Sequence, residues 1–289
     1  MPKRWQHPTP VTVPPDLETE IGGHPLILET LVRRGFTTPD AAREFMFWSH
    51  HTPASPFDLP DMDRAVQRLK RAIANKEQIL VWGDFDVDGQ TSTALLVSAL
   101  RDLGAVVTSY IPSRLKEGHG ITVASLKRQL DGGAQLLLTC DTGVDEHEAI
   151  TYANSHGVDV VVTDHHKLPN ALPDAYAIVN PRRTPPDHPL RHLPGVGVAY
   201  KLIEALTPPE DEPTHLLDLV ALGIVADVAP QIGDTRYLLQ RGLAALSGTK
   251  RVGLKVMMEL AEVNPVDVNE DDIGFRLAPR LNAIGRLDD

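Results

Sequence analysis

Three aspartates recur at every second position in the stretch VWGDFDVDGQTST, residues 81–93. Asp84, Asp86 and Asp88 follow the apolar run QILVW, and alternate side chains of a strand point to one face. Like charges on one face repel, and an unpaired carboxylate beside an apolar sheet is costly. The spacing therefore indicates that these carboxylates surround a cation. The ordinary alternative is an acidic turn in which Asp88 caps a helix that begins near Gly89.

Two further motifs and one lone acid carry similar chemistry. The motif TCDTG contributes Asp141, and TDHHK contributes a carboxylate followed by two imidazoles, Asp164, His165 and His166. Imidazole is the commonest metal ligand, and a neighbouring carboxylate can orient it. Taken singly, the first motif is also explained by a helix cap and the second by a solvated loop. Asp227 differs because it is the only ionisable group in LVALGIVADVAP, and a buried aspartate needs a partner.

The elements that position these residues follow a regular alternation. Four aliphatic runs, QILVWGD, VVTSYIP, QLLLTCD and VDVVVTD, alternate with helical patterns, TSTALLVSALRDLG, TVASLKRQLDGG and DEHEAITYANSHG. This order predicts an α/β fold with a parallel sheet flanked by helices. Residues 1–60 alternate proline clusters with short helical patterns and predict an N-terminal cap, residues 61–190 form the α/β core, and residues 191–289 form a C-terminal helical portion that leads to a linker helix.

The motif acids fall at the C-terminal ends of the predicted strands, which is the edge where open parallel sheets bind ligands. We therefore expect the motifs to form one site. Oxygen ligands with one or two imidazoles suit Mn²⁺ or Mg²⁺ better than Zn²⁺. Two such ions, about 3.5 to 4 Å apart and sharing a carboxylate, would clamp the attacking and leaving oxygens of a phosphoester.

The composition of the chain indicates its class and limits its possible partners. The chain of 289 residues has 42% hydrophobic and 23% charged residues, which is typical of a globular protein. Its net charge of −11 argues at face value against a nucleic-acid partner, but it does not report a local basic groove, and bound cations would neutralise part of it. The one cysteine, Cys140, excludes an internal disulfide and is interpreted as a small buried apolar residue. The chain shows no signal-peptide pattern and no long apolar run, so we expect a cytoplasmic protein without a membrane span.

Five segments together resemble the motif set of the DHH phosphoesterase superfamily, and within it the bacterial single-strand-specific 5′-to-3′ exonucleases. They are GDFDVDGQTST, LLLTCDTGVDE, VVVTDHHKLP, DLVALGIVADVAP and FRLAPRLNAIGRL. The resemblance spans residues 78–287 and implies a two-ion centre that hydrolyses phosphodiesters. It implies Asp84, Asp86 and Asp141 as ligands of one ion, and Asp88, Asp141, His165 and Asp227 as ligands of the other. Asp164 would orient His165, and His166 would face the scissile phosphate.

The same resemblance implies single-stranded DNA as the substrate in DNA repair and recombination, with a single-strand-binding protein and a helicase as partners. The expected substrate-binding residues are His166, Arg114, Lys116, Arg276, Arg280, Asn282 and Arg286. A solvated helix face is the alternative for the arginines near the end of the chain. The glycines of LPGVGVAYKL, residues 193–202, imitate a helix-hairpin-helix phosphate turn but are interpreted as packing against the core. Other histidines, among them His119, show no ligand spacing.

The same resemblance implies a second, DHHA1-type domain with a Gly-Gly-His motif after the core, and we expect that domain to be absent from residues 1–289. We therefore expect a catalytic core. Two alternatives stay open: a small-molecule phosphodiesterase acting on nanoRNA or cyclic dinucleotides, and a non-catalytic replication scaffold. Every expected ligand position is filled, which argues against the scaffold.

Overall fold

The computed structural model describes residues 8–287, and for residues 284–287 it describes the backbone alone. The chain divides into two compact units, Met1–Thr52 and Pro53–Asp289. The boundaries expected near residues 60 and 190 stay predictions.

The first unit is a group of short helices with a small core of its own. Each of its α-helices begins with proline, whose fixed φ suits the first helical turn. The helices are α1 (Pro15–Ile21), α2 (Pro25–Arg33) and α3 (Pro39–Met46), followed by the 3₁₀ turn η1 (Trp48–His50). Their buried apolar residues are Leu17, Leu28, Leu31 and Ala42.

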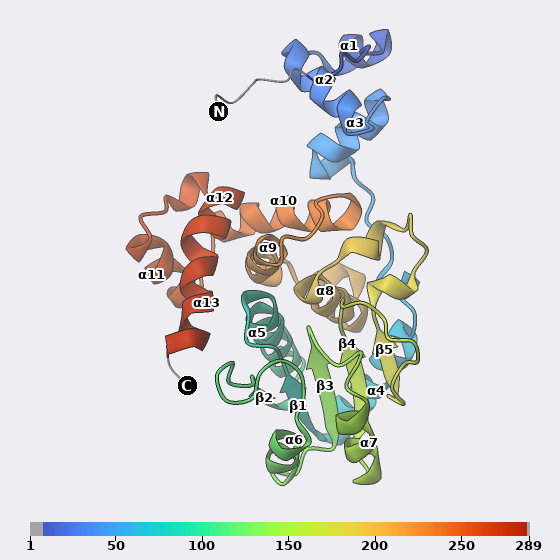
Figure 1. Cartoon of the computed structure of the whole chain (residues 1–289), viewed down its shortest axis with the longest axis vertical. Coiled ribbons are helices and arrows are strands. Elements are labelled where there is room, and N and C mark those ends of the chain that lie inside the picture. Colours follow the sequence, from blue (N-terminus) through green and yellow to red (C-terminus); the bar gives the residue numbers. More distant parts are fainter. Residues whose placement is uncertain (1–7, 288–289) are drawn as a thin grey trace, which may run out of the picture. The chain divides into compact units, whose positions relative to one another are not determined.

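The second unit is built on a parallel sheet of five strands in the order β2-β1-β3-β4-β5 (Figure 1). The strands are β1 (Gln78–Trp82), β2 (Val106–Tyr110), β3 (Leu136–Cys140), β4 (Asp159–Thr163) and β5 (Ala177–Val179). The predicted parallel α/β fold is thereby confirmed. Strand β5 was not predicted, because a run of three residues is too short to show a period.

Helices cover both faces of this sheet, and alternate strand residues divide between them. Ile79 and Val81 belong to the larger apolar core, whereas Leu80 and Trp82 belong to a smaller one. The larger core includes α4 (Met62–Asn75), α5 (Val87–Asp102) and the C-terminal helices, and the smaller includes α6 (Val123–Leu130) and α7 (His147–Ser155). Because both faces are covered, the strands are apolar throughout, as expected for a parallel sheet.

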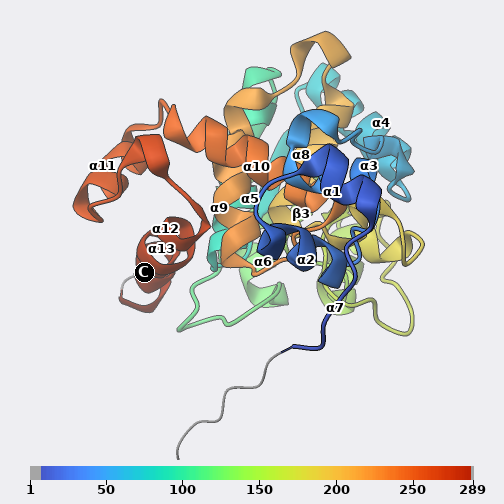
Figure 2. The same ribbon diagram turned by 90° about the horizontal axis from the view of Figure 1, so that it is seen from above.

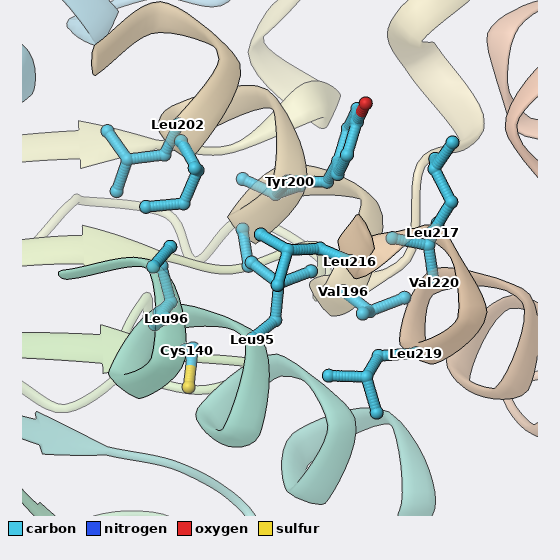
Figure 3. Packing of buried hydrophobic residues seen from close by; sticks show 14 of the residues in the cluster. Leu95, Leu96, Cys140, Val196, Tyr200, Leu202, Leu216, Leu217, Leu219 and Val220 are labelled. Carbon is cyan, nitrogen blue, oxygen red and sulfur yellow. The ribbon is translucent and has the colours of Figure 1, made fainter. Parts of the chain in front are cut away.

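The C-terminal portion is helical, as predicted. Its helices are α8 (Gly195–Leu206), α9 (Leu217–Ala226), α10 (Gly233–Ser247), α11 (Val252–Leu260), α12 (Glu270–Asp272), the π-helical turn η8 (Ile273–Leu277) and α13 (Ala278–Leu287). Helix α9 lies beside both α5 and α10 (Figures 1 and 2), which explains why its sequence is apolar on all sides. Figure 3 shows Leu95 of α5 packed among Val196 and Tyr200 of α8 and Leu219 of α9. Within residues 8–287, none of the helices combines the length and apolar character needed to cross a bilayer.

Candidate metal centre

Acidic side chains gather at the C-terminal edge of the sheet. Asp84 lies two residues after β1, and Asp141 and Asp164 directly follow β3 and β4. All three are nearly inaccessible, with 4%, 2% and 1% of their surface exposed, and Asp88 in the first turn of α5 has 2% exposed. The fold therefore collects at one edge carboxylates that are far apart in the sequence.

Three groups of side chains each place their potential ligand atoms within 4.8 Å of one another. The groups are Asp84, Asp86 and Asp141; Asp88, His165 and Asp227; and Asp141, His165 and His166. Asp141 and His165 each belong to two groups, so the three form one connected centre. Two of the groups correspond to the ligand sets that the family resemblance implied. The third adds His166, which the resemblance placed at the phosphate.

The ring of His165 lies among carboxylates from three different elements. Its Nε2 atom is 2.9 Å from Oδ1 of Asp141 and 3.8 Å from Oδ2 of Asp88. Its Nδ1 atom is 3.9 Å from Oδ2 of Asp227, which follows the last turn of α9. An imidazole in this position can serve as a nitrogen ligand beside oxygen ligands.

Asp164 organises the turn that carries both histidines. Its Oδ1 accepts hydrogen bonds from the backbone N–H groups of His165 (2.7 Å) and His166 (3.0 Å), and its Oδ2 accepts from Val144 N–H (2.9 Å). The imidazole that it contacts is that of His166, through Nδ1 at 2.8 Å, and not that of His165 as expected. Because consecutive residues point their side chains in different directions, one carboxylate orients only one of the two rings.

Two residues absent from the sequence-based list hold the same turn from the other side. Asn180, fully buried after β5, donates from Nδ2 to the carbonyl of His166 at 3.1 Å. Arg182 donates from Nε to the carbonyl of His165 at 2.7 Å. The segment NPRR that contains both follows a strand at the same sheet edge, but that strand was too short to be recognised.

The N-terminus of α8 binds the carboxylate of Asp88. The backbone N–H of Gly195 donates to Oδ2 at 2.6 Å, and that of Val196 donates to Oδ1 at 2.8 Å. A Cβ on Gly195 would lie 2.7 Å from Cβ and Oδ1 of Asp141, so only glycine allows this approach. The interpretation of LPGVGV as core packing is therefore incomplete, since its first glycine contacts the acidic centre. The residue that caps α5 is Asp86, which accepts from the N–H of Gly89 at 3.0 Å, and not Asp88.

The electrostatics of the centre call for a cation. Burial, reinforced by neighbouring carboxylates, raises the pKa of Asp88 and of Asp141 well above the ordinary range. Burial also raises the pKa of Asp84 and of Asp227. Oδ1 of Asp84 is buried and accepts no hydrogen bond from the described residues. Buried carboxylates with unsatisfied oxygens beside an imidazole fit a hard divalent cation.

The pKa of Asp164 shifts in the opposite direction from that of the other acids, because Asp164 is paired with His166. Burial alone would raise the pKa of Asp164, but the hydrogen bond from His166 and those from the backbone outweigh it, so that pKa is lowered. The same bond to Asp164 raises the pKa of His166. The His166 side chain is 58% exposed, so a partly protonated imidazole is available to an incoming anion.

The predicted cationic residues divide between two places. The guanidinium of Arg114 lies 4.8 Å from the centre of the Phe85 ring, and Lys116 belongs to the same loop after β2. Arg276 donates a hydrogen bond to the carbonyl of Glu262 at 3.1 Å, and Arg280 donates one to the carbonyl of Arg276. Both side chains therefore bond to the backbone of the C-terminal helical portion.

The last two predicted substrate residues lie in α13. Asn282 lines a cavity of about 610 Å³ together with Ala226 and Val228, the two neighbours of Asp227. The side chain of Arg286 lies outside the described residues.

One contact at the acidic centre was not expected. Nδ1 of His119, in the loop after β2, is 3.0 Å from Oδ2 of Asp84. In the sequence His119 shows no ligand spacing, so no role is predicted for it. The available signal was the one that singled out Arg114 and Lys116, namely a loop that leaves a strand at the ligand-binding edge.

Comparison with known proteins agrees with this geometry. Residues 78–224, about half of the chain, match the DHH family, N-terminal domain. The chain belongs to the DHH family. It is 40% identical over 264 residues to the single-stranded-DNA-specific exonuclease RecJ of Bacillus subtilis, a match that covers 91% of this chain and 33% of that protein. It is 41% identical to RecJ of Escherichia coli, over 80% of this chain and 43% of that protein.

Solved structures show the same relationship. The crystal structure of exonuclease RecJ bound to manganese matches with a TM-score of 0.75 and 36% identity, over 82% of this chain and 60% of that one. RecJ from Thermus thermophilus in complex with Mn²⁺ matches with a TM-score of 0.81 and 31% identity, over 96% of this chain and 40% of that one. The chain thus spans between a third and a half of the length of the two curated relatives named above. The predicted membership of the DHH superfamily is confirmed.

Proposed function

We propose that this chain is the catalytic core of a metal-dependent exonuclease that hydrolyses phosphodiesters of single-stranded DNA in the 5′-to-3′ direction, in DNA repair and recombination. The observation that carries the proposal is the connected acidic centre in which Asp141 and His165 join all three ligand groups. The relatives that share the family and the fold are named as single-stranded-DNA-specific exonucleases, and two of their structures hold manganese.

The proposed ions are two Mn²⁺, with Mg²⁺ as the alternative. Asp84, Asp86 and Asp141 would hold one, and Asp88, His165, Asp227 and the shared Asp141 would hold the other. Such ions would supply positive charge for the phosphoryl oxygens and would make a bound water a better nucleophile by lowering its pKa. This donor set, rich in carboxylates and poor in sulfur, is one that such ions prefer.

The protein's own groups prepare the centre for a phosphodiester. The helix α8 amides fix both oxygens of Asp88, and Asn180 and Arg182 fix the turn of the two histidines. Asp164 orients His166 and favours its protonated form, so that its exposed nitrogen can donate a hydrogen bond to a phosphate oxygen. Prealigned groups of this kind lower the barrier because they do not have to reorganise during the reaction.

The substrate and partners are part of the same proposal. Arg114 and Lys116 stand in a loop that contacts the acidic centre through His119, which supports their predicted role toward the phosphates of a strand. Partnership with a single-strand-binding protein and a helicase rests on the family resemblance, and the expected cytoplasmic location rests on the sequence pattern of the N-terminus.

The test is the release of nucleotides from single strands labelled at the 5′ or the 3′ end, with and without Mn²⁺. We expect Mn²⁺-dependent mononucleotides from the 5′ end, little cleavage of a duplex, and a much slower reaction with Asp141→Asn. Cleavage of short dinucleotides alone would indicate a small-molecule phosphodiesterase. A chain that binds DNA without cleaving it would indicate a scaffold.

A further inference from the structure

Several hydrogen bonds to the carboxylate of Glu117 fix the loop between β2 and α6, residues 111–122. The carboxylate of Glu117 accepts hydrogen bonds from the hydroxyl of Tyr110 at 2.7 and 2.8 Å and from the N–H of Ser113 at 2.9 Å. It also accepts from Ser125 Oγ and, at 3.2 Å, from Nη2 of Arg128. These bonds lower the pKa of Glu117 against the effect of its burial. The loop is thereby fixed two residues before His119.

His119 connects this loop to the acidic centre. Its Nδ1 lies 3.0 Å from Oδ2 of Asp84, and its ring centre lies 4.2 Å from that of Phe85. The His119 side chain is 71% exposed and that of Asp84 is 6% exposed, so the contact joins a surface loop to a buried acid. The two neighbouring glycines shape this arrangement. Gly118 and Gly120 have φ of 74° and 85°, and a Cβ on Gly120 would lie 2.0 Å from Oε1 of Glu146.

The two carboxylate oxygens of Asp84 have different surroundings. Oδ2 is engaged by His119, whereas Oδ1 is buried and accepts no hydrogen bond from the described part of the chain. Among residues 8–287, the groups of three potential ligands that include Asp84 contain Asp86 and Asp141 but not His119. His119 therefore contacts a ligand and does not take a ligand position.

We propose that His119 is a positioning residue: its Nδ1–H bond to Oδ2 holds the Asp84 carboxylate so that Oδ1 is presented to the ion held by Asp84, Asp86 and Asp141. This inference rests on the proposed metal centre and adds a residue to it. Hydrogen bonds of this kind to metal ligands commonly change metal affinity by about 10- to 100-fold. The same bond ties the loop that carries Arg114 and Lys116 to the ion site.

Two substitutions separate the hydrogen bond from the ring. His119→Phe keeps an aromatic ring against Phe85 and removes the donor, whereas His119→Asn places an amide N–H near the position of Nδ1 and removes the ring. A matched control is His156→Phe, because His156 is another exposed histidine whose ring centre lies close to an aromatic ring, 4.1 Å from that of Tyr152. Mn²⁺ binding is measured by calorimetry on the full chain without nucleic acid, so that the readout does not depend on activity.

We expect His119→Phe to weaken one of two Mn²⁺ sites by about tenfold or more, while His119→Asn and His156→Phe bind both ions as the parent chain does. In an Asp84→Asn background, His119→Phe should cause no further loss, because the residue acts through Asp84. Unchanged binding by His119→Phe, equal losses in the Phe and Asn variants, or a further loss in the Asp84→Asn background would overturn the inference. If the parent chain itself binds no Mn²⁺, the proposed function fails as well, and this outcome is distinct from a parent with two sites and an indifferent His119→Phe.

If His119→Phe does not fold, His119→Leu, which also removes the donor, takes its place with the same expected loss of one site. Folding of each variant is checked by its circular dichroism and its thermal midpoint without metal. In that case, a loss of one site in His119→Asn alone would contradict the proposed role of the N–H donor.

Discussion

Nε2 of His165 lies 2.9 Å from Oδ1 of Asp141, and these two side chains are the members that the three ligand groups share. Each comes from a different strand end, β4 for His165 and β3 for Asp141. A change at either residue disturbs two groups at once, whereas a change at Asp84 or Asp227 disturbs one. This difference predicts an order of severity among substitutions.

Asp141→Asn should therefore lower the single-turnover rate constant by about tenfold more than Asp84→Asn, since loss of the shared carboxylate misaligns both proposed ions. Single-turnover cleavage of a labelled single strand at saturating Mn²⁺ measures the two rates. Equal rates in the two variants would show that Asp141 is an ordinary ligand of one ion.

The two adjacent histidines should differ in what they lose. His165→Ala removes a ring that faces three carboxylates, so Mn²⁺ affinity should fall. His166→Ala removes an exposed ring bonded to Asp164, so affinity should stay near that of the parent while turnover falls by about 10²-fold or more. Mn²⁺ binding and kcat are measured on both variants, and equal losses of metal affinity would refute this division of roles.

Mn²⁺ should raise the thermal midpoint, and the gain should increase with pH. The folded-state pKa of Asp88 and of Asp141 is raised, so without ions these groups cost no stability below the unfolded-state pKa. Their cost grows as pH rises toward the folded-state pKa. Ions bind the deprotonated carboxylates and cancel that cost over the same pH window. Scanning calorimetry with Mn²⁺ and with a chelator, from the ordinary aspartate range to neutrality, measures the gain, and a gain independent of pH would contradict the account.

Gly195→Ala should damage the centre although Gly195 carries no side chain. The added Cβ would meet Asp141 at 2.7 Å, and either the carboxylate or the start of α8 must shift. We expect a loss of about 1 to 3 kcal/mol in the free energy of unfolding together with weaker Mn²⁺ binding. Gly253→Ala in α11 is the matched control, because its Cβ would have nothing within 4 Å and should stabilise the helix. Chemical denaturation and calorimetry compare the two, and parent-like behaviour of Gly195→Ala would show that the close approach is not needed.

Much of the fold and the identity of the acids could be predicted from the sequence. Parallel strands can be recognised in the sequence because short apolar runs alternate with helical patterns. The C-terminal ends of such strands lie at one edge of the sheet. Asp84, Asp141 and Asp164 could therefore be brought together without coordinates. Asp227 could be singled out as the one ionisable group in an apolar helical run, but only the motif resemblance placed it with the other acids.

The contacts that orient these acids could not be predicted. His119 contacts Asp84, which lies 35 residues earlier in the sequence, and the N–H of Gly195 donates to Asp88, which lies 107 residues earlier. Such contacts depend on the path of the loop back to the sheet edge and on the residue at which a helix begins. Neither can be predicted from local propensity. The choice of His166 over His165 by Asp164, and of Asp86 over Asp88 as the cap of α5, likewise depends on side-chain direction within one turn.

The most direct test of the two-ion centre is an electron paramagnetic resonance titration of the metal-free chain with Mn²⁺. We expect two ions to bind per chain with a spin-coupled signal, since ions that share Asp141 would lie about 3.5 to 4 Å apart. Asp141→Asn should lose the coupled signal. A single site, or two sites whose signals are those of isolated ions, would contradict a two-ion centre that shares Asp141.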